Sequence, residues 1–176
     1  MNTFVLSLEA MTESKRTCSA WLSLGSNLGD RKVNLDKAII FIRERLGRVE
    51  RVSAYYESDA WGFESSNAFL NCCLELHTTL GALVLLEGLL DIEQELGRTR
   101  SGQDYADRTV DLDLLLYDQQ VLDHPKLKLP HPGMAVRRFV LEPLAEIAPG
   151  LQHPLEGKSI AALLAECPDS SPLRPL

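Results

Sequence analysis

Two aspartates and three arginines form the densest group of residues in this chain that could do chemistry. Asp111 and Asp113 flank Leu112 at the start of an apolar run, 114–117, which is short enough for a buried strand. Side chains two positions apart on a strand share a face, with their backbones roughly 7 Å apart, so both carboxylates should point the same way. Carboxylates in this arrangement suit Mg²⁺, which keeps water and phosphate oxygens as its other ligands.

The arginines of this group are suited to phosphate. Arg98, Arg100 and Arg108 lie with the two aspartates within sixteen positions. A guanidinium binds phosphate through paired hydrogen bonds, so these residues predict a site for a phosphorylated ligand and a metal ion. A structural alternative stays open: the aspartates could lie at a solvated strand edge, with Arg108 simply paired to Asp111.

The composition is that of one folded domain with an acidic surface. The chain has 176 residues, of which 45% are hydrophobic and 24% charged, and its net charge is −7. That charge argues against a general nucleic-acid binder, which needs a basic surface. The four cysteines lack metal-ligand spacing, and we expect free thiols in a cytoplasmic protein. We expect no signal peptide, membrane span or membrane partner, because no segment has the required apolar pattern.

Hydrophobic periodicity predicts the order strand, helix, strand, strand, helix, strand. The ranges are 19–24, 50–57, 69–79 and 111–117 for the strands, and 30–46 and 81–96 for the helices. This order is that of the ferredoxin-like α+β sandwich, a single domain in which helices cover one face of an antiparallel sheet. The other face is expected to be free for loops and ligands. We also expect a turn at 25–27, a hairpin beginning at 119–122, a short helix near 159–164 and a fraying tail at 168–176.

Several short motifs, taken together and in order, resemble one enzyme family. They are Leu24-Gly-Ser-Asn-Leu28, Phe69 with Asn71, Gly97-Arg-Thr-Arg100, Arg108-Thr-Val-Asp-Leu-Asp113, Pro130-His131, and Arg137 with Phe139. Over roughly residues 18 to 155 they resemble the 6-hydroxymethyl-7,8-dihydropterin pyrophosphokinase family of folate biosynthesis. The resemblance implies transfer of pyrophosphate from ATP to the pterin hydroxymethyl group with release of AMP. It also implies two Mg²⁺ ions as cofactors, and ATP and the pterin as partners.

The resemblance assigns roles to individual residues. Asp111 and Asp113 would hold the metal ions, and with Arg98 and Arg108 they would form the catalytic group. The residues implied in ATP binding are Glu93, Arg98, Arg100, Tyr105, Arg108, His131 and Arg137. The residues implied in pterin binding are Ser58, Asp59, Ala60, Trp61, Phe69, Asn71 and Phe139. The two phenylalanines would stack on the flat ring, and the asparagine would meet its amide-like edge. Taken singly, these aromatic residues would more often belong to a core.

Residues 1–16 are expected to form a flexible N-terminal extension, 17–166 the pyrophosphokinase domain and 167–176 a C-terminal tail. Asp107 departs from the family pattern, and its carboxylate is expected to compete for Arg108 and weaken the hold of that arginine on phosphate. The segment from Ser101 to Asp107 is expected to close over ATP as a lid that excludes water.

Two other function classes stay open. One is another ATP- and Mg²⁺-dependent enzyme on the same sandwich, which would not need the cluster of Phe69, Asn71 and Phe139. The other is a non-catalytic module for RNA or a metabolite. RNA binding would need exposed aromatic residues in basic surroundings, and a metabolite module would not need paired aspartates beside three arginines. We expect a monomer, because no dimerisation stripe is visible.

Overall fold

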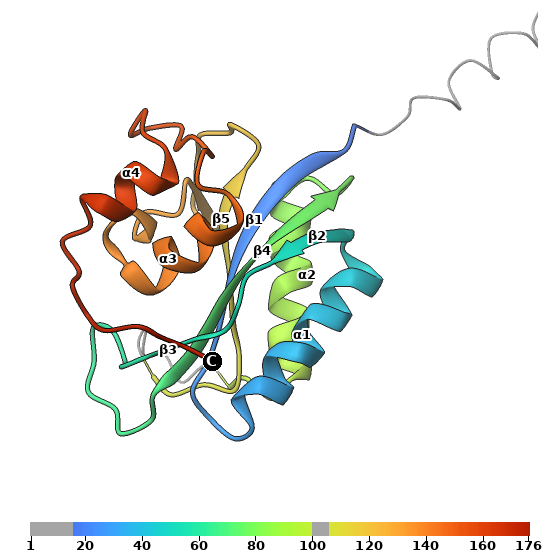
Figure 1. Ribbon diagram of the computed structural model, residues 1–176. Helices are drawn as coiled ribbons and strands as arrows, with labels where there is room; N and C mark the ends of the chain where they lie inside the picture. The colour runs from blue at the N-terminus through green and yellow to red at the C-terminus, as the bar shows by residue number, and fades with distance from the viewer. Residues whose placement is uncertain (1–15, 100–105) are drawn as a thin grey trace, which may run out of the picture.

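An antiparallel sheet forms the centre of the structure, a computed structural model that describes residues 16–99 and 106–176. In that part of the chain the sheet consists of β1 (Cys18–Ser26), β2 (Arg48–Val52), β3 (Tyr56–Ser58), β4 (Phe69–Thr78), β5 (Asp111–Tyr117) and β8 (Arg174–Pro175). Strand β1 lies between β5 and β4, and β4 pairs on its other side with both β2 and β3 (Figure 1). The element order is the predicted β-α-β-β-α-β of an α+β sandwich, with β2 and β3 sharing the place of the second strand.

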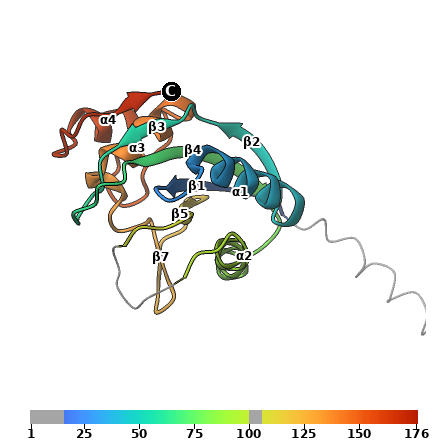
Figure 2. The same ribbon diagram turned by 90° about the horizontal axis from the view of Figure 1, so that it is seen from below.

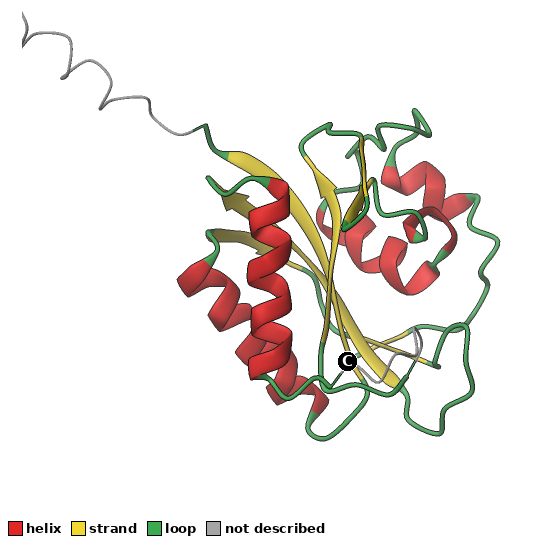
Figure 3. Cartoon of the chain, turned by 180° about the vertical axis from the view of Figure 1, so that it is seen from behind, coloured by secondary structure: helices red, strands yellow, loops and turns green. Residues whose placement is uncertain are grey.

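Helices α1 (Arg31–Arg45) and α2 (Ala82–Glu95) run side by side along one face of the sheet (Figure 3). Asp30 is the N-cap of α1, because its carboxylate oxygen accepts a hydrogen bond from the Val33 backbone N–H at 3.0 Å. The core under these helices contains four alternate residues of β4, which share one face of the strand: Leu70, Cys72, Leu74 and Leu76. Burial of this apolar face is the main force that holds the two helices to the sheet.

The opposite face of the sheet carries a second core. Helices α3 (Arg138–Ile147) and α4 (Ile160–Ala165) lie on this side, away from α1 and α2 (Figure 2). Trp21, Cys73 and Leu115 from the sheet pack there against Val140 and Leu144 of α3. The expectation that this face is free for loops and ligands was therefore wrong over much of its length, because β1, β4 and β5 bear apolar side chains on both faces.

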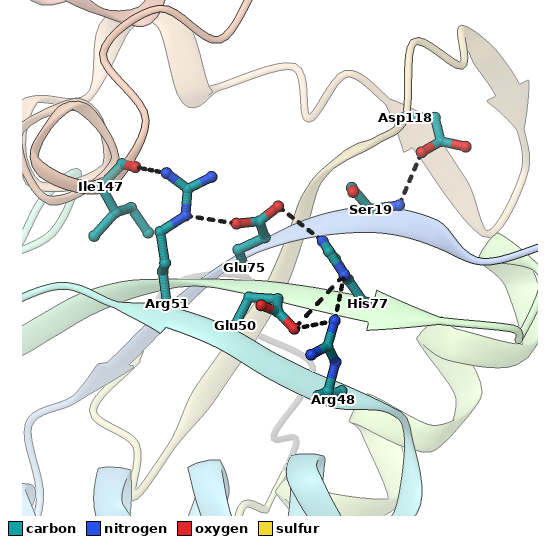
Figure 4. Close-up of polar contacts among 8 residues, drawn as sticks. All are labelled: Ser19, Arg48, Glu50, Arg51, Glu75, His77, Asp118 and Ile147. Atoms are coloured by element: carbon teal, nitrogen blue, oxygen red, sulfur yellow. Dashed lines mark hydrogen bonds and ion pairs between the residues drawn. The ribbon is translucent and has the colours of Figure 1, made fainter.

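A polar network fixes the C-terminal end of α3 to the sheet (Figure 4). Arg51 donates from Nε to Glu75 at 2.7 Å and from Nη1 to the Ile147 carbonyl oxygen at 2.5 Å. Glu75 is only 6% exposed and also lies 3.0 Å from His77. The open part of this face is thus the other end, where β1 stops and β4 and β5 begin.

The strand predicted at 50–57 is interrupted, because a side chain takes over part of the backbone pairing. Ser53 donates its backbone N–H to the Cys73 carbonyl oxygen at 2.9 Å, but the Cys73 N–H bonds the Ser53 hydroxyl at 3.0 Å instead of a backbone carbonyl. The regular ladder therefore stops at β2 and resumes at β3.

The C-terminal third contains the predicted hairpin, as β6 (Leu122–His124) and β7 (Leu127–Leu129), followed by the short 3₁₀ helix η2 (Met134–Val136). The short helix expected near 159–164 is α4, whose N-cap Ser159 accepts from the Ala162 N–H. Fraying of the tail was a wrong expectation: β8 pairs with β3, and the Leu176 N–H bonds the Tyr55 carbonyl oxygen at 3.0 Å. None of the helices in the described ranges has the length and apolarity needed to cross a membrane.

Candidate active site

Three strand ends meet at the open end of the second face, and Gly25 lies between them. In the pairing register Gly25 is opposite Asn71 of β4 and opposite Asp111 of β5. A Cβ atom at Gly25 would lie 3.1 Å from the Asn71 Oδ1 and 3.6 Å from the Phe69 ring, so a side chain here would crowd the site. The predicted turn at 25–27 is wrong in this detail, because β1 continues to Ser26. Sequence reasoning thus missed Gly25, whose signal was a glycine at the end of a buried strand.

Two hollows adjoin this point, and Asp111 and Asp113 line both of them. We call the first the aromatic pocket; with the space open to solvent it measures about 480 Å³. Its lining is Ser23, Gly25, Ser58, Asp59, Trp61, Phe63, Phe69, Asn71, Arg108, Asp111, Asp113, Arg137 and Phe139. We call the second the basic cleft; measured in the same way, it is about 1000 Å³. Its polar lining is Glu93, Arg98, Asp111, Asp113, His124, Lys126, Lys128 and His131.

The aromatic pocket gathers six of the seven residues predicted for pterin. The exception is Ala60, which lines a smaller cavity behind the pocket. Asn71 is 3% exposed and donates from Nδ2 to the Ser58 hydroxyl at 2.9 Å, while its Oδ1 receives no hydrogen bond in the described ranges. Phe63, which sequence reasoning missed, meets Phe69 edge to face at 6.2 Å between ring centroids.

The ion pair between Arg108 and Asp111 that the structural alternative proposed is present, and Asp111 also pairs with Arg98. The solvated strand edge of that alternative is wrong, because the Asp111 side chain is only 16% exposed. Its carboxylate lies 2.5 Å from Arg98 Nη1 and 2.7 Å from Arg108 Nη2. Burial acts to raise the pKa of Asp111, but the charges of Arg108 and Arg98 outweigh it, and the pKa is lowered. These pairs pre-position two arginines at the boundary between the pocket and the cleft.

Asp113 has a different environment, although it shares a strand face with Asp111. It forms no ion pair within the described part of the chain. Burial, followed by the charges of Asp111 and Glu93, raises the pKa of Asp113 to about 7. Arg108 and Arg137 only partly offset this repulsion, so this half-buried carboxylate is a place where a cation would be favoured.

These two carboxylates fit Mg²⁺ bound together with phosphate oxygens. No group of three or more His, Cys, Asp or Glu side chains converges as a metal cage within residues 16–99 and 106–176. Mg²⁺ seldom uses such a cage; it is usually held by one or two carboxylates, waters and substrate phosphates. Asp111 and Asp113 are therefore sufficient as the protein's share of such a site.

Glu93 was predicted to bind ATP, but its carboxylate is only 2% exposed and lies behind Arg98. One carboxylate oxygen is 2.6 Å from Arg98 Nη1 and accepts the Leu112 backbone N–H at 2.8 Å. In this position Glu93 orients Arg98 and fixes the backbone at the start of β5.

Two further polar groups lie beside Asp111 and Asp113, Arg108 in the lining of the pocket and His131 in that of the cleft. The Arg108 Nε is buried without a hydrogen-bond partner in the described ranges, and its guanidinium lies 5.1 Å from the Phe69 ring centroid. His131 lies in a loop between two prolines, where its Nδ1 accepts a hydrogen bond from the Gly133 N–H at 3.2 Å. Burial, followed by the charge of Arg137, lowers the pKa of His131, so the neutral ring keeps its proton on Nε2 as a donor.

The expected competition between Asp107 and Arg108 was wrong. The Asp107 carboxylate accepts hydrogen bonds from Ser65 at 2.6 Å, Asn27 at 2.7 Å and Asn67 at 2.8 Å. Asn27 in turn accepts from the Arg108 backbone N–H at 2.7 Å. Asp107 therefore ties three loops together at the border of the pocket and supports the backbone of Arg108.

Two of the predicted ATP residues, Arg100 and Tyr105, and most of the predicted lid lie outside the described residues. Arg137 lines the aromatic pocket rather than the cleft, with its guanidinium 4.5 Å from the Trp61 ring centroid. Lys126 and Lys128 line the cleft and were not predicted; a lysine-containing hairpin beside the aspartates was the available signal.

The chain is similar in sequence to pyrophosphokinases from several bacteria. Three relatives are named 2-amino-4-hydroxy-6-hydroxymethyldihydropteridine pyrophosphokinase. The Porphyromonas gingivalis protein is 44% identical over 137 residues, covering 76% of this chain and 92% of its own. The Bacillus subtilis protein is 43% identical over 129 residues (73% and 77%). The Pseudomonas aeruginosa protein is 42% identical over 149 residues (84% and 91%).

A similarity in structure extends to a more distant protein. The crystal structure of Plasmodium falciparum HPPK-DHPS aligns with a TM-score of 0.71 at 15% sequence identity, covering 88% of this chain. This chain spans only 46% of that longer one, and the likeness concerns the fold alone. The model of the family "7,8-dihydro-6-hydroxymethylpterin-pyrophosphokinase (HPPK)" matches residues 21–149. The chain therefore belongs to the 7,8-dihydro-6-hydroxymethylpterin-pyrophosphokinase family.

Proposed function

We propose that the chain transfers pyrophosphate from ATP to the hydroxymethyl group of 6-hydroxymethyl-7,8-dihydropterin, with the pterin in the aromatic pocket and ATP in the basic cleft. Family membership supports the reaction, pyrophosphoryl transfer to hydroxymethyldihydropterin in folate biosynthesis. The observation that carries the assignment of the two hollows is that Asp111 and Asp113 line both. A phosphate chain entering from the cleft would meet a hydroxyl group entering from the pocket at these carboxylates.

Asp111 and Asp113 would hold the metal, which we propose to be two Mg²⁺ ions. Bound there with ATP, Mg²⁺ would reduce the repulsion between the phosphates and the incoming oxygen. Asp113 suits this role because it forms no ion pair in the described ranges, and the charges of Arg108 and Arg137 only partly offset the repulsion from Asp111 and Glu93. Asp111 suits metal binding because its carboxylate can bind a cation when Arg98 and Arg108 exchange it for the phosphate oxygens of ATP.

The arginines would neutralise the phosphate chain as charge moves toward AMP. Arg98 faces the cleft and Arg108 faces the pocket, so the two approach the reacting phosphate from opposite sides. The unpartnered Arg108 Nε offers one more donor to a phosphate oxygen. The Nε2–H of His131 would donate near the leaving oxygen. Arg137 and, outside the described residues, Arg100 would add positive charge.

The aromatic pocket would orient the pterin ring so that its hydroxymethyl group faces the aspartates. Phe69 and Phe139 both line the pocket and would stack on the two faces of the ring. Asn71, fixed by Ser58, presents an acceptor that no protein donor occupies among the described residues. A ring held in this way reacts as an intramolecular group would, which favours in-line attack on the β-phosphorus.

The decisive test is an assay of AMP release with ATP, Mg²⁺ and the pterin, run on wild type, Asp113→Ala and Asp91→Ala. Asp91 is an exposed aspartate of α2 and serves as the matched control. We expect AMP and pterin diphosphate in equal amounts, a loss of at least about 100-fold in Asp113→Ala, and no loss in Asp91→Ala. Pterin binding without AMP release would mean a binding protein, and release of AMP with no need for pterin would mean another nucleotide enzyme.

The proposal includes a monomer in the cytoplasm that does not bind nucleic acid. Cys18, Cys72, Cys73 and Cys167 all have free thiols, as expected in a reducing compartment. The net charge of −7 opposes nucleic-acid binding. Light scattering of the purified protein tests the monomer directly, and a mass of twice 19.6 kDa would contradict it.

A further inference from the structure

Residues 168–176, which we call the C-terminal tail, lie beyond the 21–149 range that the family model matches. The end of the tail forms β8, which pairs with β3 so that Arg174 is opposite Glu57. The C-terminus accordingly lies beside β3 in both views (Figures 1 and 2). Strand β3 leads directly into residues 58–61, the loop that forms one wall of the aromatic pocket. The tail therefore holds the strand that carries this wall.

The beginning of the tail holds the opposite wall, through Asp169. One Asp169 oxygen accepts the Arg138 backbone N–H at 3.0 Å, and the other accepts the Ser171 N–H at 2.9 Å. Arg138 is the first residue of α3, and the side chain of the N-cap Arg137 makes no capping hydrogen bond. Asp169 thus supplies from a distance the acceptor that a helix N-terminus requires.

The charge state of Asp169 suits this capping role. Burial acts to raise the pKa of Asp169, but hydrogen bonds from Ser171 and the Arg138 backbone outweigh it, and the pKa is lowered. The side chain is therefore ionised at neutral pH, the form that binds a helix N-terminus best. The other end of α3 is already fixed by Arg51 (Figure 4).

The two walls and the tail meet at a smaller cavity that adjoins the aromatic pocket and, measured in the same way as the pocket, is about 260 Å³. Ser58 to Trp61 line it from the loop, Phe139 from α3, and Asp169 and Leu173 from the tail. The tail thus closes the back of the pocket, and displacing it would leave Phe139 and the loop without support on that side.

We propose that the C-terminal tail is a positioning element for pterin binding. Asp169 sets the first turn of α3 with Phe139, and β8 sets the loop 58–61, so together they fix the distance between the two walls of the pocket. This inference rests on the proposed function, because it takes the pterin as the occupant of the pocket.

The test compares pterin and ATP binding in Asp169→Ala, Asp169→Asn and the control Glu166→Ala. Glu166 is an exposed acid just before the tail that pairs with Lys158. The loss of one helix cap typically weakens the helix about fivefold in equilibrium constant. We expect Asp169→Ala to weaken pterin binding, measured by fluorescence, by about the same factor, because binding must then order the first turn of α3 itself. Asp169→Asn keeps one oxygen acceptor, so it should restore binding to within about twofold of wild type. Binding of a non-hydrolysable ATP analogue and the control variant should stay unchanged.

A deletion of residues 174–176 separately removes β8 and should weaken pterin binding in the same selective way. Wild-type pterin affinity in Asp169→Ala, or equal losses for pterin and ATP, would overturn the proposal. Hydrogen exchange of the ligand-free protein distinguishes this failure from failure of the proposed function. If wild type binds no pterin, the proposed function falls, and the tail is judged by exchange alone. Faster exchange in Asp169→Ala confined to 58–61 and the first turn of α3 supports positioning, and unchanged exchange refutes it.

Discussion

Replacement of Glu93 should separate two contributions that this buried carboxylate makes to the site. Glu93 accepts the Leu112 N–H at 2.8 Å and pairs with Arg98 at 2.6 Å, and its own exposure is 2%. Glu93→Ala removes these two contacts among the described residues. Glu93→Gln keeps the shape and an oxygen acceptor for Leu112 but removes the charge that faces the arginine.

The expected losses follow from burial. A buried N–H left without an acceptor costs about 1–3 kcal/mol, and removing one partner of a buried ion pair costs about 3–5 kcal/mol. Arg98 keeps Asp111 as a second partner, so the pair contributes at the lower end of that range. Glu93→Ala should therefore lower the free energy of unfolding by about 4–6 kcal/mol, because it loses both contributions. Glu93→Gln loses only the charged pair and should lower it by about 3 kcal/mol.

Urea denaturation followed by circular dichroism measures these losses, with Glu87→Ala as the control. Glu87 is an exposed glutamate on the same helix, and its removal should change the free energy of unfolding by less than about 0.5 kcal/mol. Glu93→Gln should also lower the pKa of Asp113, because the charge of Glu93 is one cause of its raised value. Equal stability of the alanine and glutamine variants would refute the argument that Leu112 needs this acceptor.

Three further substitutions test the site. In the ligand-free protein the pKa of Asp113 is raised to about 7, above the unfolded value, so stability falls as pH rises from about 4 through 7. Asp113→Asn should therefore raise the free energy of unfolding by about 1–3 kcal/mol at pH 8 and by much less at pH 5. Equal gains at both pH values would contradict this. Asp107→Ala removes three hydrogen bonds at an exposed position and should cost about 1–2 kcal/mol in thermal or urea unfolding; no loss would mean that the three loops are held by other contacts. Phe139→Ala should raise the KM for the pterin more than about tenfold while the KM for ATP stays within about twofold, and parallel changes in both would count against Phe139 as a pterin contact.

Much of the local structure was predictable because it depends on short-range pattern. The helix after Asp30 and the strands at 69–79 and 111–117 lie where apolar periodicity placed them, to within about two residues. The break in the strand at 50–57 was not predictable, because it depends on the Ser53 hydroxyl meeting Cys73 on another strand. A single sequence carries no local signal for such a replacement.

The sequence alone determined the family, and with it the reaction, and the strand that carries the two aspartates. Period-two spacing put Asp111 and Asp113 on one face, and the order of motifs identified the family. Only the tertiary structure decided what those residues face: Asp111 between two arginines, Asp113 without an ion pair in the described ranges, and Asp107 on Asn27 rather than Arg108. The reason is that charge environment depends on groups brought together from distant positions, as Asp169 is brought to the start of α3. Spacing along the chain sets the direction of a side chain, but folding alone selects its partners.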